Sequence, residues 1–217
     1  MDRYHIVLEK PIIKELSTAD ALTRKVRTRL NEYLGFDVDT LLRDTDAVVF
    51  GGAVRDSLAE MEIHDVDIMA LPRAAANIAN RLVVGMGFKR VSLSTVDVAT
   101  LYAGVKVINE PWTYLKNKAI VQVIRPAIRY KNPISDLNGL LSNVDISACG
   151  VTYNGSVGEV VKLAIEDCCN KRFAVIPYAS MCQNNRIHIR TAKLEDRGWK
   201  QYENIKDLRA WSNIVYT

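Results

Sequence analysis

The amino-acid sequence predicts an α+β or α/β protein, a sheet with interleaved helices that is followed by a helical C-terminal piece. Short apolar stretches of strand length alternate with stretches in which apolar residues recur at helical spacing. The last clearly patterned segment, residues 185–199, is helical and follows the last strand-like stretch. Hydrophobic residues make up 48% of the 217 positions, which is enough for a substantial core.

The order of the elements follows from local signals. Ser17 and Thr18 can cap a first helix, whose apolar positions continue to Leu34 before Gly35 ends it. The boundaries of the other helices and strands are predicted from alternating polarity, from apolar runs and from turn residues. Strands are expected at 47–50, 66–71, 90–93, 96–102, 105–109, 119–124, 144–153 and 172–176, and helices at 53–61, 73–88, 132–141, 158–168 and 185–199.

Composition and charge narrow the class of protein. The four cysteines form no C-x-x-C pair, which indicates reduced thiols in a cytoplasmic protein rather than a disulfide framework or a zinc site. The charged N-terminus is unlike a signal peptide, and no apolar run approaches the ~20 residues that span a bilayer, so no membrane association is expected. A net charge of +4 is compatible with a polyanionic partner without requiring one.

Two carboxylates, Asp65 and Asp67, stand at the start of the strand-like stretch 66–71. Residues two apart on a strand point to the same face of a sheet. Carboxylates held that close repel one another unless a counter-charge is present, and oxygen ligands of this kind suit Mg²⁺. The pair therefore predicts a Mg²⁺ site, with Mn²⁺ as a second possible occupant. A solvated strand end is the other interpretation of an isolated Asp-x-Asp.

Gly51 and Gly52 form the predicted turn between the strand at 47–50 and the helix at 53–61. Glycine lets backbone N–H groups approach a ligand closely, and the N-terminus of a helix attracts phosphate. Arg55 lies one turn into the helix, within reach of the same anion. We therefore expect these three residues to bind the phosphates of a nucleotide. A tight turn followed by an exposed arginine is the alternative.

The stretch "GGAVRDSL…HDVDIM", at 51–58 and 64–69, closely resembles the head-domain signature of the DNA polymerase β-type nucleotidyltransferase superfamily. Within it the likeness is to tRNA CCA-adding enzymes and bacterial poly(A) polymerases. "VDISACGVTYNG" (144–155) resembles a later strand of that family, and "NRIHIRTAKLEDRGWK" (185–200) resembles its arginine-bearing neck helix. The resemblance implies an α+β fold, with a mixed sheet, flanking helices and a helical neck. It divides the chain into a head at 1–180 and a neck at 181–217.

Several departures from the family pattern limit what the resemblance implies. The later strand of CCA-adding enzymes begins Arg-Arg-Asp, whereas here it begins Asn143-Val144-Asp145, without the arginine expected near the ribose. Residues 183–185 are Gln-Asn-Asn where the family has an aspartate that pairs with bases. Selection of C and A is therefore not implied. The chain ends soon after the neck, so the family's body and tail domains are expected to be absent.

Two further candidates rest on the resemblance. Many members of the superfamily take a third catalytic carboxylate from a later strand, and Asp145 is the candidate here, with a cap at the strand entry as the alternative. In the helix at 185–199, Arg186, Arg190, Lys193 and Arg197 are spaced to form one basic stripe. The likeness to the neck favours nucleotide contacts for Arg186 and Arg190, against a solvated face or an RNA-backbone contact. Arg197 is expected to pair instead with Glu195, with Asp196 or with solvent.

The resemblance implies a metal-dependent nucleotidyltransferase. Asp65, Asp67 and Asp145 would be catalytic, with Asp65 and Asp67 holding the metal. The donor would be a nucleoside triphosphate, ATP or CTP, and the favoured acceptor is the 3′ hydroxyl of an RNA, extended without a template. Modification of a protein or small molecule, as in toxin-like members, is an alternative. So is a catalytically inactive module that binds nucleotide or RNA. Base choice, acceptor and oligomeric state are left open.

Overall fold

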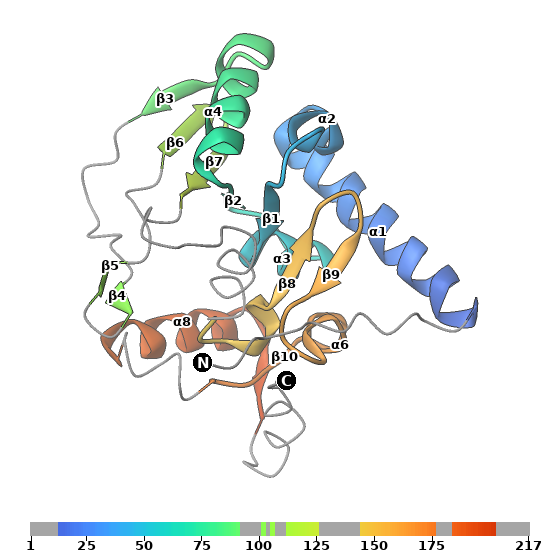
Figure 1. Ribbon diagram of the computed structural model, residues 1–217. Helices are drawn as coiled ribbons and strands as arrows, with labels where there is room; N and C mark the ends of the chain where they lie inside the picture. The colour runs from blue at the N-terminus through green and yellow to red at the C-terminus, as the bar shows by residue number, and fades with distance from the viewer. Residues whose placement is uncertain are drawn as a thin grey trace, which may run out of the picture.

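A computed structural model describes residues 13–91, 101–102, 105–106, 112–125, 144–176 and 184–202, with side chains described except at 13–18, 101–102, 105–106 and 184–186. Figure 1 shows the arrangement of its elements. The helical segments are α1 (Ile13–Leu34), α2 (Val38–Leu42), α3 (Gly52–Leu58), α4 (Pro72–Asn80), the π-helix η1 (Arg81–Gly85), the 3₁₀ turn η2 (Ser147–Cys149), α6 (Ala164–Asn170) and α8 (Asn184–Asp196).

The centre of the fold is a seven-stranded sheet in the order β3-β6-β7-β2-β1-β8-β9. Only β2 and β7 pair in parallel, and every other neighbouring pair in this sheet is antiparallel. The mixed sheet and its helices confirm the predicted α+β class. Its strands are β1 (Val48–Phe50), β2 (Val66–Met69), β3 (Lys89–Val91), β6 (Trp112–Lys116), β7 (Ala119–Ile124), β8 (Val151–Tyr153) and β9 (Val157–Glu159).

Four further strands form two separate pairs. β10 (Arg172–Phe173) and β11 (Lys200–Gln201) pair in parallel, and β4 (Leu101–Tyr102) pairs with β5 (Val105–Lys106). The first pair links the end of α6 to the chain beyond α8. Among the described residues no helix combines the length and the apolar character needed to cross a membrane.

The two faces of the sheet differ. Val49, Ile68 and Val123 are paired across β1, β2 and β7, and all three are fully buried in one hydrophobic core with residues of α1, α3 and α4. Neighbouring residues in a strand alternate between faces. The row Phe50, Asp67 and Gln122 therefore lies on the opposite face, where all three are only half-buried in the described structure. The carboxylate of Asp67 thus leaves the sheet away from the helix-packed core.

Three predicted elements are corrected. The strand expected at 144–153 is interrupted by η2, because the Ser147 hydroxyl donates to the Asp167 carboxylate and accepts from the Ala174 N–H. Gly150 then lies against Val161, where a Cβ would come within 2.5 Å of that side chain. The helix expected at 158–168 begins only at α6, since β9 takes its first residues. The helix expected at 73–88 is split between α4 and η1.

Other differences are omissions. α2, β6 and β11 were not predicted. The sequence signal for β6 was present, because an alternating stretch is joined to β7 by a two-residue turn in which Asn117 has a positive φ of 53°. The helix expected at 132–141 and most of the strands expected at 96–102 and 105–109 lie outside the described residues.

Candidate active site

Asp67 lies within β2, as predicted, and Asp65 is the residue before the first residue of that strand. In the sheet Asp67 is paired with Phe50 of β1 and with Gln122 of β7. Its Oδ1 atom is buried and accepts no hydrogen bond in the described structure. Burial, with the nearby charge of Asp65, raises the pKa of Asp67 to about 7, and the Arg190 guanidinium opposes part of that rise. One buried oxygen of this carboxylate, beside a second carboxylate, is therefore left without a hydrogen-bond partner in the described structure.

This arrangement fits a divalent cation. A carboxylate whose pKa is raised by burial and by a second carboxylate is stabilised by a positive ion, and an unpartnered buried carboxylate oxygen is a suitable ligand atom. A preformed cage is not present: among the described residues no three His, Cys, Asp or Glu side chains gather closely enough to hold a metal ion. A Mg²⁺ ion bound by one or two carboxylates completes its shell with water and substrate phosphates, so two protein ligands suffice.

The helix α1 holds the segment that leads into these carboxylates. Three of its residues, spaced four apart, contact three of the residues at 60–64, a segment between α3 and β2. The Lys25 ammonium lies 2.7 Å from the Glu60 carboxylate, and the Arg29 guanidinium donates to the Met61 carbonyl at 2.5 Å. The Tyr33 hydroxyl donates to the His64 carbonyl at 2.5 Å and accepts from the Ile120 N–H of β7 at 3.0 Å.

Tyr33 is close to the predicted metal site as well. Burial raises the pKa of its phenol, and the charge of Asp65 raises it too, so the hydroxyl lies within the electrostatic reach of that carboxylate. By fixing the carbonyl of the residue before Asp65 to the β7 backbone, Tyr33 sets where Asp65 leaves the chain. This role could not be predicted from local sequence patterns, because the contact joins residues 31 positions apart.

Replacing Tyr33 with phenylalanine should loosen this connection without opening a cavity. We expect a loss of about 1–2 kcal/mol in the free energy of unfolding and a several-fold weaker binding of Mn²⁺ in the absence of nucleotide. Tyr153→Phe is the matched control. Tyr153 is buried, whereas Tyr33 is half-buried, and the Tyr153 hydroxyl accepts from Arg27 of α1 and donates to Asp39 of α2.

The measurements are urea unfolding and Mn²⁺ binding by electron paramagnetic resonance. The control should lose stability and keep its Mn²⁺ affinity. Equal Mn²⁺ binding by the two variants would show that Tyr33 serves only the stability of the fold.

The structure brings Gly51, Gly52 and Arg55 together. Gly51 has φ 69° and ψ −128°, a conformation that side chains disfavour, and its N–H donates to the Val151 carbonyl of β8 at 3.1 Å. An added Cβ on Gly52 would lie 3.7 Å from the Arg55 guanidinium. The glycines therefore form the tight strand-to-helix turn that was predicted. Their contact with phosphate stays a prediction.

Arg55 is more enclosed than the sequence suggested. Its side chain is 11% exposed, its Nε donates to Asp56 at 2.7 Å and its Nη1 to the Cys149 sulfur at 3.3 Å. Burial lowers the pKa of the guanidinium, but Cys149 and Asp56 outweigh burial and hold that pKa above its ordinary value. The side chain is thus a buried, paired cation. A contact between Arg55 and a nucleotide would have to come from the Nη2 group of the guanidinium, which lies beside Gly52.

Asp145 and Arg190 form an ion pair between the segment before η2 and the helix α8. Asp145 is buried, and its second oxygen, Oδ2, has no hydrogen-bond partner in the described structure. Arg190 also donates to the Cys149 sulfur at 3.8 Å and acts on the charge of Asp67. Arg190 is therefore in the same neighbourhood as Asp67 and Asp145. The predicted catalytic role of Asp145 stays a prediction, and the side chain of Arg186 lies outside the described residues.

A second ion network joins α3 to the end of α8. Asp56 is 3% exposed and accepts from Arg55 at 2.7 Å and from Arg197 at 3.0 Å. Arg197 also donates to the Glu62 carbonyl at 2.9 Å, and the Trp199 indole N–H points to the Met61 sulfur at 3.0 Å. The expectation that Arg197 pairs with a neighbouring carboxylate or solvent was wrong, because the turn after α8 returns the chain to α3. The division into head and neck at residue 180 stays a prediction.

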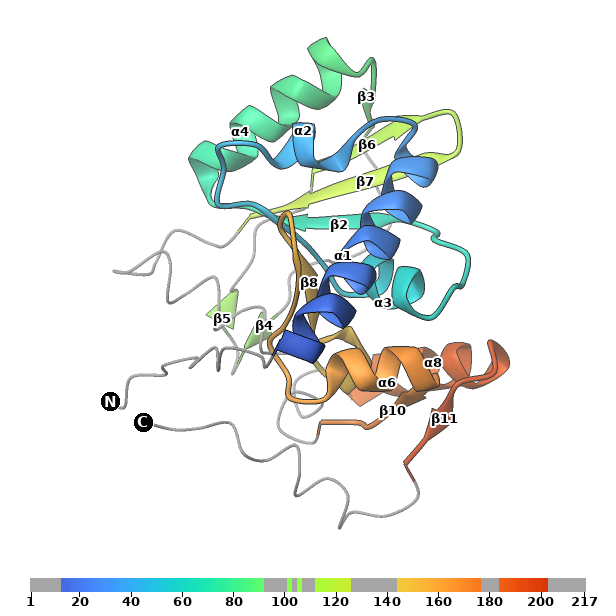
Figure 2. The same ribbon diagram turned by 90° about the vertical axis from the view of Figure 1, so that its right-hand side faces the viewer.

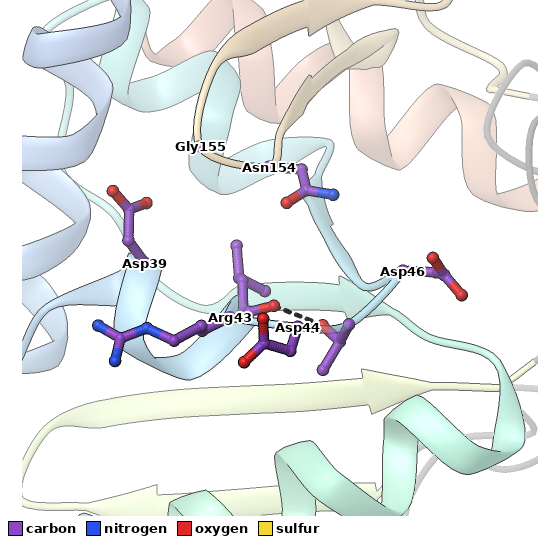
Figure 3. Close-up of a pocket in the computed structure, with 8 residues that line it drawn as sticks. Asp39, Arg43, Asp44, Asp46, Asn154 and Gly155 are labelled. Carbon is purple, nitrogen blue, oxygen red and sulfur yellow. Dashed lines mark hydrogen bonds between the residues drawn. The ribbon is translucent and has the colours of Figure 1, made fainter.

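A surface hollow of about 530 Å³ lies away from these residues (Figure 3). It is lined from α2, from the segment entering β1 and from the turn between β8 and β9, and Asp39, Asp44 and Asp46 outnumber its one guanidinium, that of Arg43. Such a lining repels a triphosphate. The hollow is also at the start of β1, whereas Asp67 pairs with Phe50 at its other end.

Comparison with known proteins supports the fold. No protein-family model matches the sequence, and no curated protein matches it significantly. Among solved structures, a CCA-adding enzyme in complex with CTP matches with a TM-score of 0.61, covering 91% of this chain and 46% of that chain at 16% identity. The fold is that of the CCA-adding enzymes. The predicted resemblance is thereby confirmed at the level of structure.

Two more CCA-adding enzyme structures agree. A complex with ATP has a TM-score of 0.53 at 16% identity, and the Thermotoga maritima enzyme in complex with tRNA has a TM-score of 0.50 at 17% identity. Each match covers 99% of this chain and 45% of the other. The chain therefore spans less than half the length of the CCA-adding enzymes it matches.

Proposed function

We propose that the chain is a Mg²⁺-dependent nucleotidyltransferase that moves a nucleoside monophosphate from ATP or CTP to the 3′ hydroxyl of an RNA without a template. The observation that carries the proposal is the Asp65–Asp67 pair in a CCA-adding-enzyme fold, with Asp67 on the face of the sheet opposite the helix-packed core and a buried Asp67 oxygen that has no partner in the described structure. Solved structures of that fold hold CTP, ATP and tRNA, which supports the choice of donor and acceptor.

The reaction requires one bond to form and one to break. The acceptor hydroxyl oxygen attacks the α-phosphorus, its proton passes to solvent, and pyrophosphate leaves with the electron pair of the broken P–O bond. Asp65 and Asp67 would hold Mg²⁺, which neutralises the charge that develops on the phosphates. Arg190 would offer its guanidinium to the nucleotide while Asp145 keeps it oriented. Gly51, Gly52 and the free edge of Arg55 would line the phosphate side, with Arg186 as a further nucleotide contact.

The decisive experiment incubates the protein with each labelled triphosphate in turn, with Mg²⁺ and with total RNA or total protein as acceptor. Label on RNA supports the proposal. Label on protein would make the chain a protein-modifying enzyme instead, and no label with any acceptor would make it a binding module. Asp65→Ala and Asp67→Ala proteins are the controls, since both should fold and neither should transfer.

Replacing Arg190 with alanine should weaken binding of the triphosphate about 10- to 100-fold, because a hydrogen-bonded charge contact contributes about 1.5–3 kcal/mol. Lys193→Ala is the matched control, since Lys193 is an exposed cation on the same helix. Calorimetry with nucleotide alone measures the first effect, and RNA affinity against salt measures a second. Arg190→Ala could instead bind nucleotide normally and show only a smaller salt dependence of RNA binding, by roughly 0.7–0.9 per lost phosphate contact. That result would show that Arg190 contacts RNA and that its assignment to the nucleotide is wrong.

A further inference from the structure

Positive charge is concentrated in one part of the sheet. Residues 70–91 and 112–125 comprise α4, η1, β3, β6 and β7, and we call them the basic lobe. They hold seven of the 29 lysines and arginines of the chain and none of its 25 carboxylates. The basic lobe therefore carries a formal charge of +7 and the rest of the chain −3. The net charge of +4 is therefore the sum of a strongly positive part and a slightly negative part of the chain.

The basic lobe lies at one end of the molecule. Figures 1 and 2 show β3 at its outer edge, with α6 and α8 toward the opposite end. Lys89 and Arg90 of β3 and Lys118 of the β6–β7 turn are exposed. No ion pair within the described part of the chain involves these three residues. Two of these exposed charges are on the edge strand β3, and the third is on the turn between β6 and β7.

An aromatic ring orients part of this charge. The guanidinium carbons of Arg90 and Arg125 lie 4.9 and 3.9 Å from the centroid of the half-buried Trp112 ring. Stacking on an aromatic ring holds a guanidinium in place while leaving N–H groups at its edge to donate. Oriented arginines of this kind suit phosphate oxygens better than mobile lysines do.

The sheet connects this edge to the carboxylates. Asp67 is paired with Gln122, Gln122 with Thr113 and Thr113 with Val91, so one row of residues runs from β2 to β3. Lys89 is two residues from Val91 and lies on the same face, whereas Arg90, which is paired with Tyr114, lies on the opposite face of β3. Because strands are about 4.8 Å apart, three steps place β3 roughly 15 Å from β2. The edge strand β3 is therefore a few nucleotide lengths from Asp67.

We propose that the exposed edge formed by Lys89, Arg90 and Lys118 binds the sugar-phosphate backbone of the RNA acceptor, a few nucleotides upstream of its reacting 3′ end. The proposal rests on the proposed function only for the position of that end. A stretch with seven cations and no carboxylate attracts polyanions at long range, and the stacked arginine contacts them at short range. Contacts to phosphate of this kind position an RNA without reading its sequence.

The test compares two triple variants that remove equal charge. Lys89→Gln/Arg90→Gln/Lys118→Gln alters the proposed edge. Arg24→Gln/Lys162→Gln/Lys200→Gln alters three exposed cations elsewhere. The probe is a fluorescent RNA hairpin with a single-stranded 3′ tail, and anisotropy gives its affinity from low to moderate KCl without nucleotide.

The edge variant should bind at least about tenfold more weakly at low salt, with a salt slope lower by about 2, because three phosphate contacts at roughly 0.7 each are lost. The control variant should match the wild-type protein in both. An edge variant with unchanged affinity and slope overturns the proposal, as does a control that loses as much or a wild-type protein that does not bind the hairpin. Loss of binding as expected, in a protein that transfers label to no acceptor, leaves this surface standing and contradicts only the transferase activity.

Discussion

Replacing Asp67 with asparagine should abolish nucleotide transfer and at the same time stabilise the metal-free protein. The rate of transfer should fall at least about 10³-fold, which corresponds to an activation free energy higher by about 4 kcal/mol. The reason is that the substitution removes a ligand for the ion that neutralises phosphate charge. The fold should gain about 1 kcal/mol or more above pH 7, because a carboxylate that has a buried oxygen and a pKa of about 7 beside Asp65 opposes folding when it is ionised.

The stability difference between the Asp67→Asn and wild-type proteins should depend on pH in a defined direction. A carboxyl whose pKa is raised in the folded state binds more protons folded than unfolded, so it costs stability as pH rises from about 4 to about 7. The difference between the Asp67→Asn and wild-type proteins should therefore grow over that interval and stay constant above it. Mn²⁺ should raise the melting temperature of the wild-type protein and not that of the variant.

Asp46→Asn is the control, since Asp46 is an exposed carboxylate in the acidic hollow. It should leave transfer, pH dependence and the Mn²⁺ response unchanged. A well-folded Asp67→Asn protein with near wild-type turnover would remove Asp67 from the catalytic machinery. A variant that loses stability above pH 7 would contradict the charge conflict that we infer at this position.

The parts of the fold that could be predicted from the sequence are those set by neighbours along the chain. The turn at Gly51, the helix behind it and the strand with Asp65 and Asp67 each depend on signals within a few residues, and all were located. The strand expected at 144–153 failed because Ser147 forms its hydrogen bonds with Asp167 and Ala174, 20 and 27 positions away. Strand propensity does not include such competing bonds.

The candidate site could also be predicted only in part. The types of residue in it were visible as motifs, but their partners were not. Arg190 joins Asp145 across 45 positions and Arg197 joins Asp56 across 141, and no periodicity reports contacts of that span. The positive charge of the basic lobe could be counted from the sequence. Its position relative to Asp67 could not, because it depends on the strand order, which puts β3 at an edge and β2 three strands away.

Replacing Asp56 with asparagine should cost about 3–5 kcal/mol in the free energy of unfolding, the largest stability effect that we expect. The carboxylate is buried and holds two guanidiniums, those of Arg55 and Arg197, and removing one charge from a buried pair leaves the other uncompensated. The side chain of Arg55 is too enclosed to regain water without moving α3. Asparagine keeps the shape of the side chain, so the effect measures charge rather than a cavity.

The matched control is Glu166→Gln, which breaks the exposed ion pair with Arg172 and should cost about 0–1 kcal/mol. Hydrogen exchange distinguishes a local from a global effect. Because Asp56 holds the turn that follows α8, amides of α8 should exchange faster in Asp56→Asn, by a larger factor than amides of β1 and β2. If Asp56→Asn does not fold, Arg197→Gln should show the same local exchange with a smaller loss of stability. An Asp56→Asn protein no less stable than Glu166→Gln, or unchanged exchange in α8, would show that this ion network does not hold the C-terminal helix to α3.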